Sequence, residues 1–156
     1  MIEIARWILA ATHVLAGAAW FGAMVYSLMV LHPRARAFFR SPAEFEEFIC
    51  WLAAGARWKV LGGCAVIALT GFGLLLLPTE RPASAAWRSC IVGKSLLWTF
   101  AVGLFCFASW ILWPARVLAA PADAPTFQRR FRWIAILLLA AVAANTILGV
   151  VSVHLK

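Results

Sequence analysis

Four long apolar segments run through the sequence, over residues 4–31, 58–77, 87–113 and 133–153. A helix rises about 1.5 Å per residue, so each segment is long enough to cross the roughly 30 Å hydrocarbon core of a bilayer. Apolar residues make up 65% of the 156 residues and charged residues only 13%, which excludes an ordinary soluble domain and a disordered chain. We therefore predict an all-α fold: an integral membrane four-helix bundle formed by a single transmembrane domain over residues 1–156.

The connection after the first segment carries a clear helix-start signal. Ser41 is suited to capping a helix, Pro42 to its first position and Glu44 to its third. Apolar residues then recur at helical spacing opposite two glutamates, at Phe45, Phe48, Ile49 and Leu52. This pattern predicts an amphipathic lead-in helix before the second span. The first segment is longer than the apolar region of a signal peptide, so we expect it in the mature protein.

The basic residues are distributed unevenly between the two ends of such a bundle. The net charge is +8, but the charges lie in short connections, which favours contact with lipid headgroups over nucleic acid. The side with both termini carries five, Arg6, Arg81, Arg88, Lys94 and Lys156, and the other side carries nine, Arg34, Arg36, Arg40, Arg57, Lys59, Arg116, Arg129, Arg130 and Arg132. The positive-inside rule therefore predicts that both termini lie outside the cytoplasm.

Several common site types have no residues to form them. The four cysteines show no C-x-x-C spacing and are interpreted as small buried side chains. All six acidic residues fall outside the predicted spans, and no nucleophile elbow, phosphate loop or zinc spacing occurs, so hydrolytic chemistry is not expected. Most tryptophans lie near span ends, where interfacial anchoring explains them.

An ionisable residue within a span is a functional candidate because an unpaired charge there is costly, and three such residues stand out. They are His13 in the first segment, Lys94 in the third and His154 at the end of the fourth. With antiparallel connectivity all three belong to the same leaflet, and His13 lies about 13 Å below the surface.

His13 shares one helix face with Gly17, Trp20 and Met24. One interpretation is an axial haem ligand with the porphyrin lying against Gly17 and the indole of Trp20; the other is a hydrogen-bonded histidine beside a small-residue packing notch. Lys94 is interpreted either as the cation for a haem propionate or as a lysine that extends to the interface. His154 is either a second axial ligand or an interfacial residue, and His32 is expected at a solvated helix end.

A family resemblance rests on the run from His13 to Gly22, an H-x6-W-x-G pattern followed by Pro33. This segment resembles the first helix of the CopD copper-resistance family and of the related HemJ-like protoporphyrinogen oxidases. The likeness continues in Leu69-Thr70-Gly71, in Gly93-Lys94 and in the stretch from Asn145 to Gly149.

The resemblance implies a membrane protein of the bacterial inner (plasma) membrane that binds haem b, with His13 as metal ligand and Lys94 also important. We expect a role in electron transfer or redox chemistry with a quinone or a redox protein, and homo-oligomerisation is compatible with it. The third segment lacks the histidine that often follows the lysine in the oxidases, so protoporphyrinogen oxidase activity is less favoured. Two alternatives stay open: copper import or resistance, with Cu(I) bound by His13 and Met24, and a structural subunit of a respiratory membrane complex.

Overall fold

The structure is a computed structural model that describes residues 1–78 and 84–155. All regular elements in these two ranges are helices, which confirms the all-α prediction. Four of the helical segments are long and apolar enough to cross a membrane: Ile2–Phe38, Ala56–Leu76, Ala85–Val117 and Ala124–His154. The chain is an integral membrane protein with the expected four spans in its described part.

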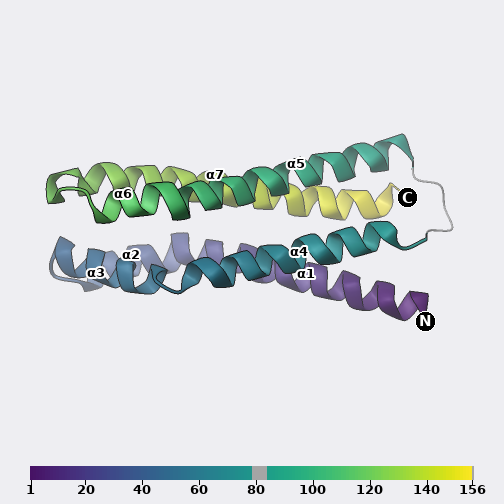
Figure 1. Ribbon diagram of the computed structural model, residues 1–156, viewed down its shortest axis with the longest axis horizontal. Coiled ribbons are helices and arrows are strands. Elements are labelled where there is room, and N and C mark those ends of the chain that lie inside the picture. Colours follow the sequence, from purple (N-terminus) through teal and green to yellow (C-terminus); the bar gives the residue numbers. More distant parts are fainter. Residues whose placement is uncertain (79–83, 156) are drawn as a thin grey trace. The chain divides into compact units, whose positions relative to one another are not determined.

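The chain divides into two compact units, Met1–Pro78 and Thr79–Lys156, and each is considered by itself. In unit 1, α1 (Ile2–Tyr26) continues through a π turn (Ser27–Leu31) into α2 (His32–Phe38). The helices α3 (Pro42–Ala53) and α4 (Ala56–Leu76) follow, and α4 returns along α1 (Figure 1). The unit is a helical hairpin with a shorter pair of helices at its turn.

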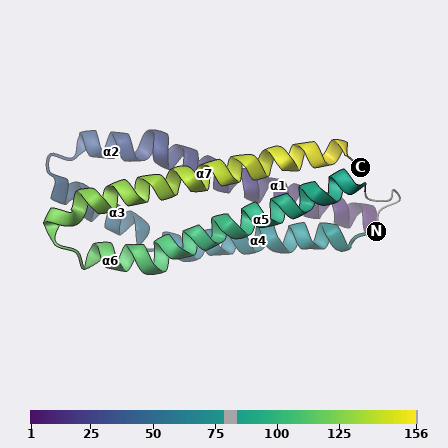
Figure 2. The same ribbon diagram turned by 90° about the horizontal axis from the view of Figure 1, so that it is seen from above.

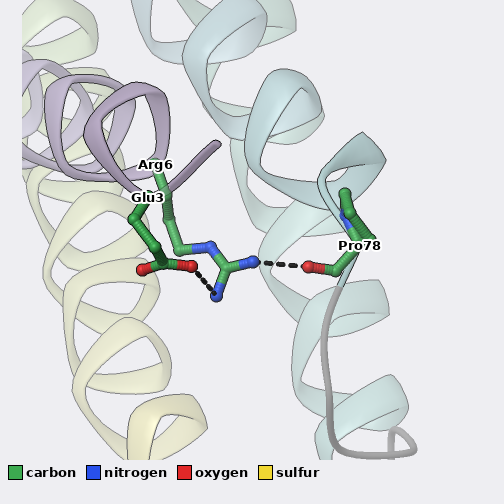
Figure 3. A network of polar contacts seen from close by, with 3 residues as sticks. All are labelled: Glu3, Arg6 and Pro78. Carbon is green, nitrogen blue, oxygen red and sulfur yellow. Dashed lines mark hydrogen bonds and ion pairs between the residues drawn. The ribbon is translucent and has the colours of Figure 1, made fainter. Parts of the chain in front are cut away.

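The open end of this first hairpin is joined by polar contacts between the start of α1 and Pro78, two residues after the end of α4. The Arg6 guanidinium forms an ion pair with Glu3, with 3.5 Å between Nη1 and Oε1, and donates a hydrogen bond to the carbonyl of Pro78 (Figure 3). Because a guanidinium offers several donors in a fixed plane, one side chain serves both partners.

Unit 2 is also a helical hairpin. It contains α5 (Ala85–Phe107), a π turn (Ala108–Leu112), α6 (Trp113–Val117), a 3-10 turn (Pro121–Asp123) and α7 (Ala124–His154). The helices α5 and α7 run side by side (Figure 2). Ser84 caps α5 by accepting the Trp87 N–H at 3.1 Å, and its hydroxyl donates to the Leu155 carbonyl at 2.8 Å. One side chain therefore both begins α5 and joins it to the end of α7.

The predicted lead-in helix is confirmed as α3. Ser41 caps it by accepting the Glu44 N–H at 3.2 Å, and the Glu44 carboxylate accepts the Arg40 N–H at 3.2 Å. Phe45 and Ile49 are buried on the predicted apolar face. All four cysteines are free; Cys64 is buried as expected, whereas Cys50, Cys90 and Cys106 are only half-buried.

The helices extend beyond the predicted spans. The first and third helices continue past residues 31 and 113 through Pro33 and Pro114, so Arg34 and Arg36 are helical. The fourth helix begins at Ala124 and not near Trp133, which brings Arg129, Arg130 and Arg132 into α7. The connection between the second and third predicted segments lies largely outside the described residues, and Glu80, Arg81 and Lys156 are among those not described.

Most side chains on the long helices are exposed, and many of them are large and apolar. Leu15 is 70% exposed and Leu69 also 70%, although both lie in the middle of an apolar helix. In water such exposure is unfavourable, whereas lipid chains solvate these groups. The helices are therefore suited to direct contact with membrane lipid.

Candidate functional site

His13 lies within the helix pair of unit 1 and contacts α4. Its Nδ1 atom is 3.0 Å from the Ile67 carbonyl oxygen and 3.0 Å from Thr70 Oγ1. The Thr70 hydroxyl donates to the Val66 carbonyl at 2.6 Å, so it accepts from His13. Since a carbonyl oxygen can only accept, Nδ1 carries the proton. In the neutral ring the Nε2 atom then holds the lone pair, which is the form that ligates metals.

Gly71 explains how the imidazole comes this close to α4. A Cβ atom at position 71 would lie 3.0 Å from His13 Cε1 and 3.4 Å from Nδ1, closer than ordinary carbon contacts. The absence of a side chain therefore gives the ring access to the Ile67 carbonyl, one turn earlier on α4. Thr70 and Gly71 occur in the sequence run that carries the family resemblance, but their contact with His13 depends on how α1 and α4 align.

Gly17 and Trp20 lie on the same face of α1 as His13, and all three are half-buried. A Cβ atom at position 17 would meet no atom within 4 Å. Within unit 1, Gly17 is therefore not a packing notch against a neighbouring helix, whereas the hydrogen-bonded histidine of the second sequence interpretation is present. Unit 1 itself leaves the space beside this part of α1 open.

Lys94 occupies a comparable place in unit 2. Asn145 Nδ2 on α7 donates an interhelical hydrogen bond to the Lys94 carbonyl at 3.0 Å. The Lys94 ammonium lies over Gly149, where a Cβ atom would be 3.1 Å from Nζ. Asp123 is the only acidic residue in 84–155, and it lies at the opposite end of the α5–α7 pair. Residues 84–155 therefore provide no nearby carboxylate for Lys94.

Trp98 is a polar group that the sequence interpretation missed. It lies one turn after Lys94 on α5, and its indole Nε1 is buried with no hydrogen-bond partner in the described part of the chain. The available signal was its position, since most other tryptophans lie near the ends of the predicted spans. A buried indole donor without an acceptor is unfavourable by about 1–3 kcal/mol.

The two other histidines are exposed, His154 at the end of α7 and His32 within the first long helical segment. His154 is exposed in the last turn of α7, beyond Gly149 and toward the Leu155 carbonyl that Ser84 binds. His32 is exposed, and its Nδ1 donates to the Ser27 carbonyl in its own helix at 2.8 Å. His32 is exposed as expected, but it lies inside the continuous helical segment Ile2–Phe38 and not at a helix end, because the helix passes through Pro33.

The structure therefore groups the predicted site residues into two sets. His13, Gly17 and Trp20 share a face of α1 in unit 1, and Lys94 and His154 belong to unit 2. In 1–78 and 84–155 no group of three or more His, Cys, Asp or Glu side chains could hold a metal ion. Axial ligation of haem needs only one or two protein side chains, so this finding does not bear on it.

Comparisons of the chain with protein-family models, with curated proteins and with solved structures gave no match. The resemblance to the CopD and HemJ-like proteins accordingly remains a prediction from the quoted residues.

Proposed function

We propose that this chain is a b-type haem-binding protein of the bacterial inner membrane that acts in electron transfer, with His13 as axial ligand. The observation that carries the proposal is the donation by His13 Nδ1–H to the Ile67 carbonyl and Thr70. Metal-ligating histidines usually donate their second ring nitrogen to a carbonyl or carboxylate, which fixes the tautomer and the ring orientation.

The surroundings of His13 also fit a large flat ligand. Gly17 leaves room one turn further along α1, and Trp20 offers an aromatic surface on the same face. When bound, haem supplies one-electron redox chemistry, and the apolar helices would exclude water from it. In unit 2, Lys94 offers a cation with no nearby carboxylate among residues 84–155, and this cation suits a propionate or another anionic group. His154, exposed at the end of α7, is proposed as the second axial ligand.

The electron donor or acceptor is proposed to be a quinone or a redox protein reached within or beside the membrane. Protoporphyrinogen oxidase-like activity is less favoured, for the reason given by the sequence. Both termini are proposed to face the side opposite the cytoplasm.

The test is an oxidised-minus-reduced visible spectrum with a pyridine haemochrome assay, on full-length protein purified in mild detergent from haem-replete cells. We expect a roughly stoichiometric b-type signal that His13→Ala abolishes. His32→Ala is the matched control, because His32 binds only within its own helix turn, and it should keep the signal. A second variant, Gly17→Leu, fills open space and should reduce haem occupancy while preserving the helical content. A colourless wild-type protein, or full occupancy in His13→Ala, would overturn the proposal.

A structural role in a larger membrane complex is the second candidate, and specific contacts favour it. The His13 and Asn145 side chains each join two helices through hydrogen bonds, which is sufficient to explain polar residues in a span. A colourless protein whose His13→Ala variant is less stable would support this alternative. Copper handling is tested separately, by measuring Cu(I) binding to the purified protein. His13 and Met24 are about 16 Å apart along α1, so these two side chains do not suit a single ion.

A further inference from the structure

A groove of about 610 Å³ opens at the turn of the first hairpin. It is formed by the end of α1, the π turn, α2 and α3. Its walls are mainly apolar and aromatic, and the residues that matter for its chemistry are Tyr26, Arg34, Ala37, Phe38, Phe39 and Phe48. Phe39 packs against Phe38 and Phe48, with ring centroids 5.4 Å and 5.2 Å apart. The groove is therefore an open, mainly apolar depression whose walls include several aromatic rings.

Arg34 is the only charged residue that lines this groove. It is exposed, and among the described residues no carboxylate forms an ion pair with it. Glu44, the first acidic residue along α3, accepts the Arg40 N–H and caps its own helix. The groove therefore combines long apolar walls with one positive charge that has no protein counter-ion.

The position of the groove identifies the medium from which a ligand reaches it. Its residues from Tyr26 to Phe38 belong to the apolar span Ile2–Phe38, and Phe38 is 80% exposed. A span end with arginines lies where lipid phosphates meet the acyl chains, and basic residues there attract anionic lipids. An acyl chain suits the aromatic walls, and a phosphate diester suits the guanidinium, which binds such oxygens with two parallel donors.

We propose that this groove binds one anionic phospholipid, with Arg34 on the phosphate and an acyl chain along Phe38, Phe39 and Phe48. The guanidinium of Arg34 has no protein counter-ion among the described residues, so it favours a lipid with a net negative headgroup such as phosphatidylglycerol. A zwitterionic headgroup is less suitable because it places its own ammonium close to the guanidinium. This site is separate from the His13 region and does not depend on haem binding.

The first test is native mass spectrometry of the full-length protein in mild detergent with added phosphatidylglycerol or phosphatidylcholine. We expect phosphatidylglycerol to be retained about fivefold more than phosphatidylcholine, the factor for one basic side chain at an anionic surface. Arg34→Gln should remove this preference. Arg40→Gln is the matched control, since it removes an equal charge at the same end without lining the groove, and it should retain the preference. An equal preference in wild type and Arg34→Gln would overturn the proposal.

Two further variants keep the test decisive if Arg34→Gln folds poorly. Ala37→Phe places a ring at an exposed position of the groove wall and should release the bound lipid with unchanged helical content. A benzophenone amino acid at position 38 should cross-link to phospholipid in membranes, seen as a lipid-sized mass addition. Cross-links to residues 84–155 or to a second copy of the chain would instead show that protein covers the groove, and would overturn the proposal.

Discussion

A histidine in a membrane span needs a partner for each ring nitrogen that carries a proton, and His13 obtains one from the backbone of α4. In an α-helix the Ile67 carbonyl normally accepts from the N–H of residue 71, so a side chain at that residue would cover it. With glycine there, the imidazole reaches the carbonyl at 3.0 Å. A polar side chain also lies over a glycine of the partner helix in unit 2, where the long, flexible Lys94 side chain lies over Gly149.

This geometry predicts that Gly71→Ala is destabilising. The added methyl group would contact His13 Cε1 at 3.0 Å, and the ring is held by two hydrogen bonds, so either the ring or α4 must move. We expect a loss of about 1–3 kcal/mol in the free energy of unfolding, measured by denaturation in mixed micelles. Gly17→Ala is the control: its methyl group meets no atom within 4 Å, and alanine favours a helix, so stability should be unchanged or slightly higher. Equal losses in both variants would contradict this account.

At this scale the sequence predicted candidate residues but not their contacts. His13 and Lys94 were identifiable because ionisable groups are rare within apolar spans. The partners Thr70 and Gly149 were not, because uniformly apolar helices carry little information about how two of them align. Trp98 was missed since an indole in a span is ordinary until its N–H is found to lack an acceptor.

At the scale of whole helices, two prolines that lie shortly after predicted spans, Pro33 and Pro114, follow π turns within a helix that continues. The His32 N–H binds the Ser27 carbonyl, and the Trp113 N–H binds the Ala108 carbonyl, each five residues earlier. Proline has no N–H to continue the regular ladder, and the shifted bond just before it lets the helix go on in a new register. Proline usually breaks a helix, and the sequence alone does not show the π turn that accommodates it. The predicted spans therefore end at residues 31 and 113, shortly before Pro33 and Pro114.

The start of α7 was predicted too late for a different reason. The apolar pattern begins near Trp133, but the helix begins at Ala124, with Asp123 before it and Pro125 in its first turn. Such a proline is typical of helix starts, so the signal was present in the sequence. The arginines of this segment obscured it because a helix can extend beyond the hydrocarbon core into the polar interface.

The second prediction concerns the link between α6 and α7. The Arg116 guanidinium carbon lies 5.3 Å from the Trp113 ring centroid and 5.2 Å from that of Phe131, and these two rings are 5.7 Å apart. Cation–π contacts of this kind are worth about 0.5–2 kcal/mol. We expect Arg116→Gln to lower the free energy of unfolding by about 1–2 kcal/mol.

Arg130→Gln provides the matched control for this prediction. It removes the same charge from the same unit, but Arg130 is exposed and contacts only Phe127 of its own helix, at 5.8 Å. Arg130→Gln should therefore lower the free energy of unfolding by no more than about 0.5 kcal/mol. If the two variants lose equal stability in the same mixed-micelle measurement, net charge and not the aromatic contact accounts for the effect.

For the molecule as a whole, the two units repeat one plan that sequence similarity does not reveal. Each has a long helix, a π turn, a proline and a returning helix. The interval from His13 to Ser27 equals that from Lys94 to Ala108, and the interval from His13 to Pro33 equals that from Lys94 to Pro114. Each intramembrane ionisable residue therefore occupies the same place along the first helix of its own hairpin.

The last prediction is the orientation of these hairpins in the membrane. If the four spans alternate in direction, the turns of both hairpins fall on the side with nine lysines and arginines, against five on the side of the termini, so the turns should face the cytoplasm. Alkaline phosphatase fused after Lys156 should be active, because it folds only outside the cytoplasm, and the same reporter fused after Ala120 should be inactive. Neutralising Arg129, Arg130 and Arg132 together makes the two sides nearly even and should give a mixed population. Phosphatase activity at Ala120 in the unaltered chain would show the opposite orientation, in which the groove beside Arg34 would face the outer leaflet.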